Sequence, residues 1–266
     1  MMSSSMEQTT AMLRGYQWTP SSLRDILTSV GGTTALLSLL DQKVESNAFS
    51  IAGMVLDIVV RCMNGHVANQ QDCLRQRTLS TLSVLILERY RSSGTGTEEE
   101  SGSTTIAAAL RNLLDMSLVP SVRHRMEHER LHEIAFNFRM WSHASITVQI
   151  QVMRVLHESV ASRPQHYRKL VGLQHFLDSV RNTYSTEARK KSLMVDDSMR
   201  HVRGKLLNTA LTMISQGSIT KNEIQALLCF LLDSTCTDSC CDVLMSLYRL
   251  LTHPDPPAGL YTHLYN

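Results

Sequence analysis

Apolar residues recur at helical spacing through most of the chain. In residues 244–251, Leu, Leu, Tyr and Leu occupy positions i, i+3, i+4 and i+7, which mark one face of an α-helix. Residues 176–184 carry a similar one-sided stripe of Phe, Leu, Val and Tyr. Three other segments, 51–60, 82–87 and 226–232, are apolar nearly all round, and such helices must be covered on several sides. The pattern predicts roughly ten helices and no strand.

Capping signals and the length of the repeating unit reduce the number of possible helical folds. Thr220 and Glu223 have the spacing of a capping box, which opens the helix that contains residues 226–232. One-sided helices that alternate with fully buried ones, in units of about 40 residues, are typical of an α-solenoid. We therefore expect an all-α fold, an α-solenoid of armadillo-like helical repeats. An irregular helical bundle is the alternative.

The segment 91–105, RSSGTGTEEESGSTT, interrupts this pattern. It has no large apolar residue and carries three consecutive glutamates, so it cannot bury enough surface to offset its ordering entropy. We expect a disordered acidic Gly/Ser/Thr-rich loop there. It separates N-terminal armadillo-like helical repeats, residues 1–90, from a continuing armadillo-like helical region of unknown function, residues 106–266.

Composition and charge exclude several classes of ligand. The 266 residues carry a formal charge of only +2, from 26 Lys+Arg and 24 Asp+Glu, and the two signs are interspersed. This gives no reason to expect nucleic acid or an anionic membrane as the main ligand. The first residues lack the pattern of a signal peptide, and no apolar run approaches the length of a membrane span. We expect a soluble, cytoplasmic chain.

The six cysteines suggest no metal site. Cys62, Cys73 and Cys229 lie in apolar helical patterns, which predicts small buried side chains. Cys236, Cys240 and Cys241 start another helix with no matching pair at zinc-finger spacing. Reduced thiols are the simplest interpretation, with a metal site or disulfide as the alternative.

One pentapeptide, HERLH at residues 128–132, matches the zinc-hydrolase pattern H-E-x-x-H. In that interpretation His128 and His132 would bind zinc and Glu129 would act as general base. A third ligand is also needed, and Glu158 is the candidate at a plausible distance in the sequence. The metzincin version is excluded, because Phe138 stands where its third histidine would be.

The surroundings of this motif favour another interpretation. His124, His128 and His132 follow i, i+4 and i+8, so they form one stripe on a helix rich in both signs of charge. A solvated helix face explains this run most simply. The same three histidines form a candidate pH-sensitive stripe, since imidazoles gain charge near pH 6.

Four segments resemble a known family, the large BEACH-domain proteins of the neurobeachin family. Each is similar to a family stretch, in family order, and together they cover about half of the chain. They are VGGTTALLSLLDQ (30–42), VANQQDCLRQRTLSTLSVLI (67–86), FNFRMWSHASITVQIQVMRVL (136–156) and HYRKLVGLQHFLDSVRNTYS (166–185).

The resemblance implies the armadillo-like region upstream of the BEACH domain. It implies a non-enzymatic scaffold that docks proteins, in vesicle trafficking and membrane dynamics, cytosolic or peripheral to intracellular membranes through the full-length protein. We expect no catalytic residue, no cofactor, no nucleic acid and no small-molecule substrate; a zinc-dependent hydrolase using HERLH is the alternative. Within these segments the residues expected to be structural anchors are Trp141, Tyr167, Gly172, Phe176 and Tyr184.

Overall fold

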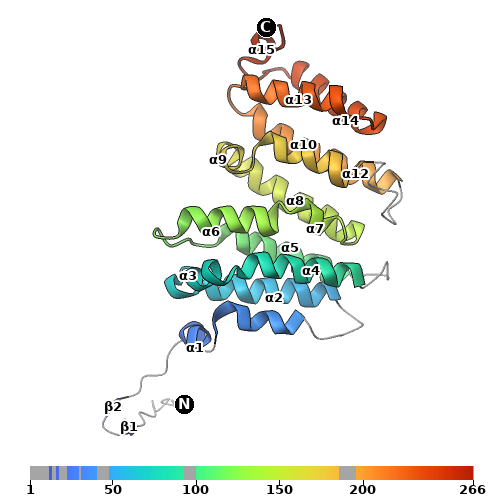
Figure 1. Ribbon diagram of the computed structural model, residues 1–266. Coiled ribbons are helices and arrows are strands. Elements are labelled where there is room, and N and C mark those ends of the chain that lie inside the picture. The colour runs from blue at the N-terminus through green and yellow to red at the C-terminus, as the bar shows by residue number, and fades with distance from the viewer. Residues whose placement is uncertain are drawn as a thin grey trace, which may run out of the picture.

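The computed structural model describes residues 12–13, 16–17, 23–29, 31–40, 48–92, 100–185 and 196–265. Figure 1 shows the helices stacked one above another, with α1 at one end of the stack and α15 at the other. The first half contains α1 (Leu23–Ser29), the 3₁₀ helix η1 (Gly32–Leu40), α2 (Ala48–Met63), α3 (Val67–Gln76), α4 (Thr78–Ser92), α5 (Glu100–Asp115) and α6 (Arg123–Glu129). The second half contains the π-helix η2 (Arg130–Ala135), α7 (Phe138–Trp141), α8 (Ile146–Ser162), α9 (Pro164–Leu170), α10 (Gly172–Thr183), α12 (Asp196–Ser215), α13 (Lys221–Asp233), α14 (Thr237–Leu251) and α15 (Leu260–Tyr265).

The helices form two layers. In the first layer α2 packs along α5, α5 along α8, α8 along α12 and α12 against α14. In the second layer α4 contacts η2 and α7, α7 contacts α10, and α10 contacts α13. Each helix therefore touches its neighbours in the stack rather than one common centre, which is the architecture of a solenoid. The predicted all-α solenoid is confirmed.

A small β-ladder lies near the N-terminus. β1 (Met12–Leu13) pairs antiparallel with β2 (Tyr16–Gln17), and Leu13 faces Tyr16. The sequence pattern predicted no strand, so this two-residue pair was missed. Two residues per strand are too few for an alternating apolar pattern, which is the signal by which strands are recognised in a sequence.

The predicted loop at 91–105 is wrong at both ends. α4 continues to Ser92 and α5 begins at Glu100, while residues 93–99 lie outside the described part of the chain. The reason is close packing between α2 and α5: a Cβ atom on Gly53 would lie only 2.9 Å from the backbone nitrogen of Ile106. This contact orders a segment whose own composition is polar. Since α2 packs along α5, the stack continues across the segment that was predicted to separate two regions.

No helix in the described ranges is both long and apolar enough to cross a membrane. The buried apolar residues instead form one continuous core that follows the stack. Its largest fully buried side chains include the aromatic residues Trp141, Tyr167, Tyr184, Phe136, Phe138 and Phe176.

Candidate interaction surface

The HERLH motif spans the junction between α6 and the π-helix η2. The N–H of Phe136 donates to the carbonyl of Leu131 at 2.8 Å, which is the wider i to i−5 spacing of a π-turn. Leu131, the fourth letter of the motif, is buried in the core. Single π-turns inside helices are frequent at functional sites.

Arg130, the central letter of the motif, is a buried structural residue. Only 4% of its surface is exposed, and its Nη1 donates to the carbonyls of Leu113, Leu114 and Met116 at 2.9, 3.1 and 3.3 Å. These carbonyls lie at the C-terminal end of α5, where a helix has no donors of its own. The Nη2 of Arg130 donates to the Oε1 of Glu127 at 3.3 Å. Arg130 therefore caps α5 and joins it to α6.

Glu129, the predicted general base, faces α3 and α4. Its electrostatic neighbours include Cys73 on α3 and Arg77, which links α3 to α4. Burial raises the pKa of this carboxyl group, and its Oε2 atom has no hydrogen-bond partner among the described residues. Burial and the charge of Glu129 also raise the pKa of the Cys73 thiol to about 12.

The histidine rings of the motif face the opposite way, toward α9 and α10. The ring centroids of His128 and His132 are 4.3 Å apart, and His175 of α10 stands 5.7 Å from His132 with its ring edge-on. Nε2 of His132 lies 3.0 Å from the carbonyl of Leu170, and Nε2 of His175 lies 2.8 Å from that of Phe136. Because a carbonyl can only accept, each Nε2 must carry the proton and donate it.

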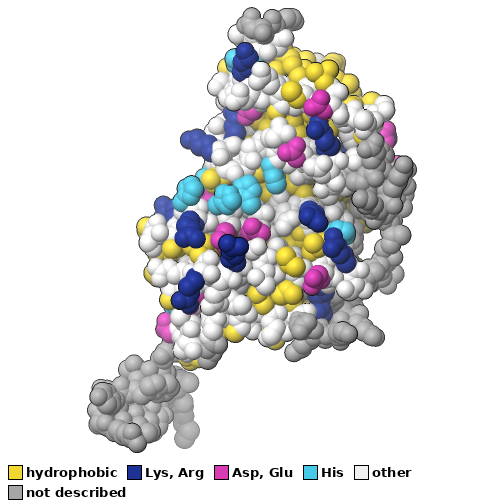
Figure 2. Space-filling model, viewed as in Figure 1, with side chains coloured by type: hydrophobic (Ala, Val, Ile, Leu, Met, Phe, Trp, Pro, Cys, Tyr) yellow, Lys and Arg dark blue, Asp and Glu magenta, His cyan; other side chains and the backbone are white. Residues whose placement is uncertain are grey.

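A further histidine completes this surface. Nε2 of His166, on α9, lies 3.0 Å from the Oε1 atom of Glu127. We call His128, His132, His166 and His175 the histidine surface. Figure 2 shows histidine side chains gathered midway along the stack. His124, the remaining member of the predicted stripe, is exposed on α6 one turn before His128.

The surroundings of His132 oppose its protonation. Burial lowers the pKa of this imidazole below its ordinary value, and the neighbouring rings of His128 and His175 lower it further. The hydrogen bond to Leu170 and the charge of Glu133 act in the other direction and are outweighed. His132 is therefore held neutral at a pH where a free histidine would begin to gain charge.

The structure does not assemble the predicted zinc ligands His128, His132 and Glu158. Glu158 lies on α8, where its carboxylate pairs with Arg111 at 2.9 Å and Arg154 at 3.8 Å. Across the described ranges, no group of three His, Cys, Asp or Glu side chains is placed to hold a metal ion. Among the described residues, HERLH is therefore not joined by a third ligand of these types.

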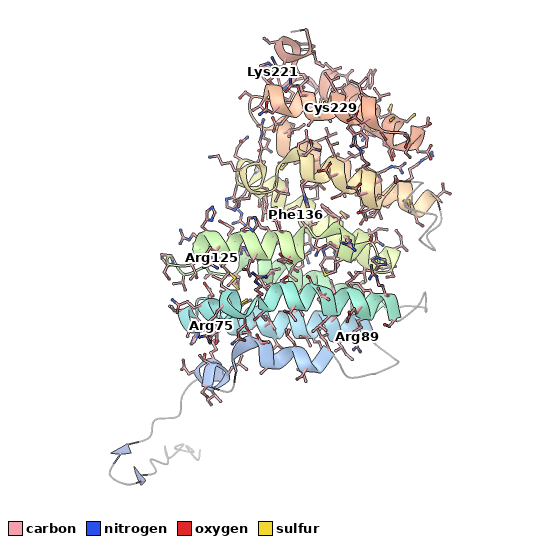
Figure 3. All side chains as sticks on the ribbon, in the orientation of Figure 1. Arg75, Arg89, Arg125, Phe136, Lys221 and Cys229 are labelled. Carbon is pink, nitrogen blue, oxygen red and sulfur yellow. The ribbon has the colours of Figure 1, made fainter. Side chains whose placement is uncertain are left out.

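Three of the predicted anchors, Trp141, Tyr167 and Phe176, contact residues at the end of the π-helix. The Nε1 of Trp141 donates to the carbonyls of Ile134 and Ala135 at 2.9 and 3.1 Å, which ends the π-helix. The rings of Tyr167 and Phe176 pack against Phe136, with centroids 5.7 and 5.8 Å away. Figure 3 shows Phe136 at the level between α6 and α9. The remaining two anchors are Gly172, at φ 74° where α9 meets α10, and the buried Tyr184 at the end of α10.

Helix-end capping by buried polar side chains recurs along the stack. Gln70 donates to the carbonyls of Met63 and Ser117 at 2.9 and 2.8 Å, and Asn69 donates to that of Cys62 at 2.9 Å. Further along the stack, Arg89 caps Leu40, Gln149 caps Ala144 and Arg203 caps Tyr184. These side chains stabilise the fold from within, whereas on the histidine surface His128 is exposed and the other three rings are half-buried.

The cysteines were predicted only in part. All six are free thiols, and Cys62 and Cys73 are buried as expected. The prediction for Cys229 is wrong, because this side chain is exposed on α13. Its apolar neighbours in the sequence suggested burial; Phe230 is indeed buried, but Leu228 is exposed like Cys229.

Comparison with known proteins identifies the architecture. A family model described as the Neurobeachin/BDCP, DUF4704 alpha solenoid region matches residues 4–264. The chain belongs to this family. The neurobeachin-family assignment confirms the resemblance found in the sequence segments and agrees with the stacked helices of Figure 1.

A curated relative supports the same family. The BEACH domain-containing protein lvsD of Dictyostelium discoideum is 26% identical over 138 residues, which are 49% of this chain and 5% of that protein. The matched segment is thus a small part of a much longer relative. No solved structure matches this neurobeachin-family chain.

Proposed function

We propose that this neurobeachin-family solenoid is a non-enzymatic scaffold that docks partner proteins on its histidine surface. The observation that supports the proposal is that some polar residues are buried as helix caps while others remain at the surface. Arg130, Gln70 and Gln149 are used inside the fold as helix caps, whereas His128 is exposed beside the half-buried rings of His132 and His175. Solenoids bind through such extended surfaces, which are formed by successive repeats.

The setting we propose is vesicle trafficking and membrane dynamics. The chain would be cytosolic and would reach intracellular membranes as part of a longer protein. The small net charge of +2 supports docking to proteins rather than direct attraction to anionic lipid or nucleic acid. No cofactor, metal or small-molecule substrate enters this proposal.

The experiment compares the partners of three forms of the full chain in quantitative affinity purification. The test variant is His124→Glu with His128→Glu, which adds two charges on exposed positions of α6 and touches no helix cap. The matched control is His201→Glu, an exposed histidine on α12. We expect specific partners to be lost from the test variant and retained by the control. Identical partner sets in all three forms would contradict docking at the histidine surface.

The lowered pKa of His132 supports a second property of the same surface. His132 lies in one cluster with the rings of His128 and His175, so any charge that His132 gains at low pH appears among closely packed rings on this surface. We propose that partner docking weakens as pH falls below about 6.5, the ordinary range of histidine. Binding of an identified partner at pH 7.5 and 5.5 tests this, and equal affinity at both would refute it.

A further inference from the structure

Two arginines and a histidine gather on one side of the stack, where α4 contacts α7. Arg91 lies in the last turn of α4, Arg139 lies on α7, and His143 follows α7 by two residues. All three side chains are exposed. Figure 2 shows Lys and Arg side chains beside a histidine on this part of the surface, over α4 and α7. We call the three residues the Arg-His cluster.

The side chains of this cluster are close together and all of them can carry positive charge. The Nη2 of Arg91 lies 3.5 Å from the Nε2 of His143. Because a guanidinium group can only donate, this Nε2 carries no proton and accepts a long hydrogen bond. Burial and the charges of Arg91 and Arg139 lower the pKa of the His143 imidazole. Both arginines are therefore close enough to His143 to influence its charge.

No carboxylate of the described residues balances the two arginines of this cluster. Elsewhere on the surface arginines form ion pairs, as Arg111 does with Glu158 at 2.9 Å. Within the described ranges neither Arg91 nor Arg139 forms such a pair. Glu88, one turn before Arg91 on α4, is exposed and is not paired with either of them. The cluster therefore carries positive charge that a bound anion would balance.

Buried aromatic rings hold the backbone beneath the cluster. Tyr90, next to Arg91, is buried, and its ring centroid lies 6.3 Å from that of Trp141. Trp141 is also buried and lies between Arg139 and His143 in the sequence. Because core packing fixes the residues next to the cluster, its backbone is preorganised, and a ligand would not have to order it.

The small size of the cluster favours one compact anion. Two guanidinium groups and one imidazole match the oxygen atoms of a single phosphate group, which arginine binds through parallel hydrogen bonds. Nucleic acids and anionic membranes are bound by larger basic areas, and the net charge of this chain is only +2. A phosphorylated side chain of a partner protein suits an exposed site on a solenoid.

We propose that the Arg-His cluster binds a phosphoserine or phosphothreonine side chain of a partner protein. Arg91 and Arg139 donate to the phosphate oxygens. The phosphate replaces the long contact between Arg91 and His143, so that the imidazole of His143 takes up a proton and donates from Nε2. The cluster shares no residue with the histidine surface, and its binding of phosphate does not depend on the docking role proposed there.

Nuclear magnetic resonance of the full chain with isotope-labelled histidine tests the proposal. The probe is a capped Gly-phosphoserine-Gly peptide, and the matched probe is the same peptide without phosphate. We expect the phosphopeptide to move the ring signals of His143 saturably toward the protonated form; these signals are assigned by their absence in His143→Gln. The ring signals of the histidine surface should stay in place, and the peptide without phosphate should move none.

Two substitutions test the donors. Arg91→Gln and Arg139→Gln should each weaken binding of the phosphopeptide at least about fivefold, because each removes a charged donor. The matched control is Arg123→Gln, an exposed arginine of α6, which should bind like the wild type. Far-ultraviolet circular dichroism should be unchanged in all three variants. The proposal is overturned by the absence of a saturable His143 shift, by an equal response to both peptides, or by wild-type affinity in both Arg91→Gln and Arg139→Gln.

Two other sources of negative charge are separated by their own measurements. Residues 98–100 are three glutamates that follow Arg91 in the sequence. Glu98→Gln with Glu99→Gln should leave the affinity for the phosphopeptide unchanged, and a tenfold gain would show that the chain's own carboxylates occupy the cluster. Cosedimentation with vesicles of phosphatidylcholine and phosphatidylserine tests a membrane. Vesicle binding that is lost in Arg139→Gln, in a chain that does not respond to the phosphopeptide, would overturn the assignment to a partner protein.

Discussion

The buried guanidinium of Arg130 offers a direct measure of how helix ends stabilise this solenoid. Replacing Arg130 by alanine removes the donors to the carbonyls of Leu113, Leu114 and Met116 and leaves Glu127 without its arginine partner. The substitution therefore isolates one cap between α5 and α6.

The magnitude follows from the contacts. A hydrogen bond to a charged group contributes about 1.5–3 kcal/mol, and removal of one partner from a buried ion pair costs about 3–5 kcal/mol. These contributions overlap, since the same guanidinium makes all of them. We expect Arg130→Ala to lower the free energy of unfolding by about 3–5 kcal/mol, equivalent to roughly 10 °C in melting temperature. Arg130→Lys, which keeps the charge but loses the planar fork, should lose about 1–2 kcal/mol.

Guanidinium chloride denaturation followed by circular dichroism measures these differences. The control is Arg123→Ala, an exposed arginine at the start of α6, which should change stability by less than about 0.5 kcal/mol. Hydrogen exchange provides the local readout: the amides of Ser117 and Val119, just beyond α5, should exchange faster in Arg130→Ala, while those of α12 are unchanged. A decrease of less than about 1 kcal/mol in the free energy of unfolding would refute the capping role. A buried group that donates to three carbonyls must affect stability when it is removed.

Three further predictions concern other parts of the molecule. Because the pKa of His132 is lowered in the folded state, the unfolded chain binds a proton at this position first as pH falls below about 6.5, and the free energy of unfolding declines. The melting temperature should therefore fall less between pH 7.5 and 5.5 in His132→Gln than in the wild type. Equal falls in the two proteins would refute this. Arg77 ends α3 at φ 52°, a left-handed conformation that is unfavourable for any residue with a Cβ atom. Arg77→Gly should therefore raise the free energy of unfolding, measured by denaturation, by about 0.5–1 kcal/mol. A lower free energy of unfolding would show that the attraction between Arg77 and Glu129 outweighs the backbone strain. Maleimide labelling followed by mass spectrometry should modify Cys229 and Cys241 in the folded chain and Cys73 only after unfolding; rapid labelling of Cys73 would contradict its burial.

Local signals in the sequence were sufficient for the fold class. The capping box of Thr220 and Glu223 is present as predicted, with both reciprocal hydrogen bonds. The helix at 100–105 could not be predicted from composition, because the contact that orders it is the close approach of Gly53 to Ile106 from another helix. Periodicity identified the helices but did not show which apolar sides remain uncovered, as at Leu232.

The candidate site was predicted less completely than the fold. The spacing of His128 and His132 placed two rings side by side, which the structure shows at 4.3 Å. His166 and His175 come from α9 and α10, and each looks unremarkable within its own helix. Only the stacking of those helices on η2 brings all four rings to one surface. No pattern within one segment carries that information, since it depends on the order in which helices pack.

Three polar residues in the segments that resemble the family bind carbonyls at or near helix ends. Asn69 and Gln70 belong to the NQQ segment and Gln149 to the ITVQ segment, and all three are fully buried with their amide nitrogens on helix-end carbonyls. A buried polar group without a partner costs about 1–3 kcal/mol, so these positions are constrained by the fold itself. Exposed residues such as His128 and Arg91 carry no such constraint. Family membership therefore transfers the solenoid architecture to this chain, while its partners must be read from its exposed surfaces.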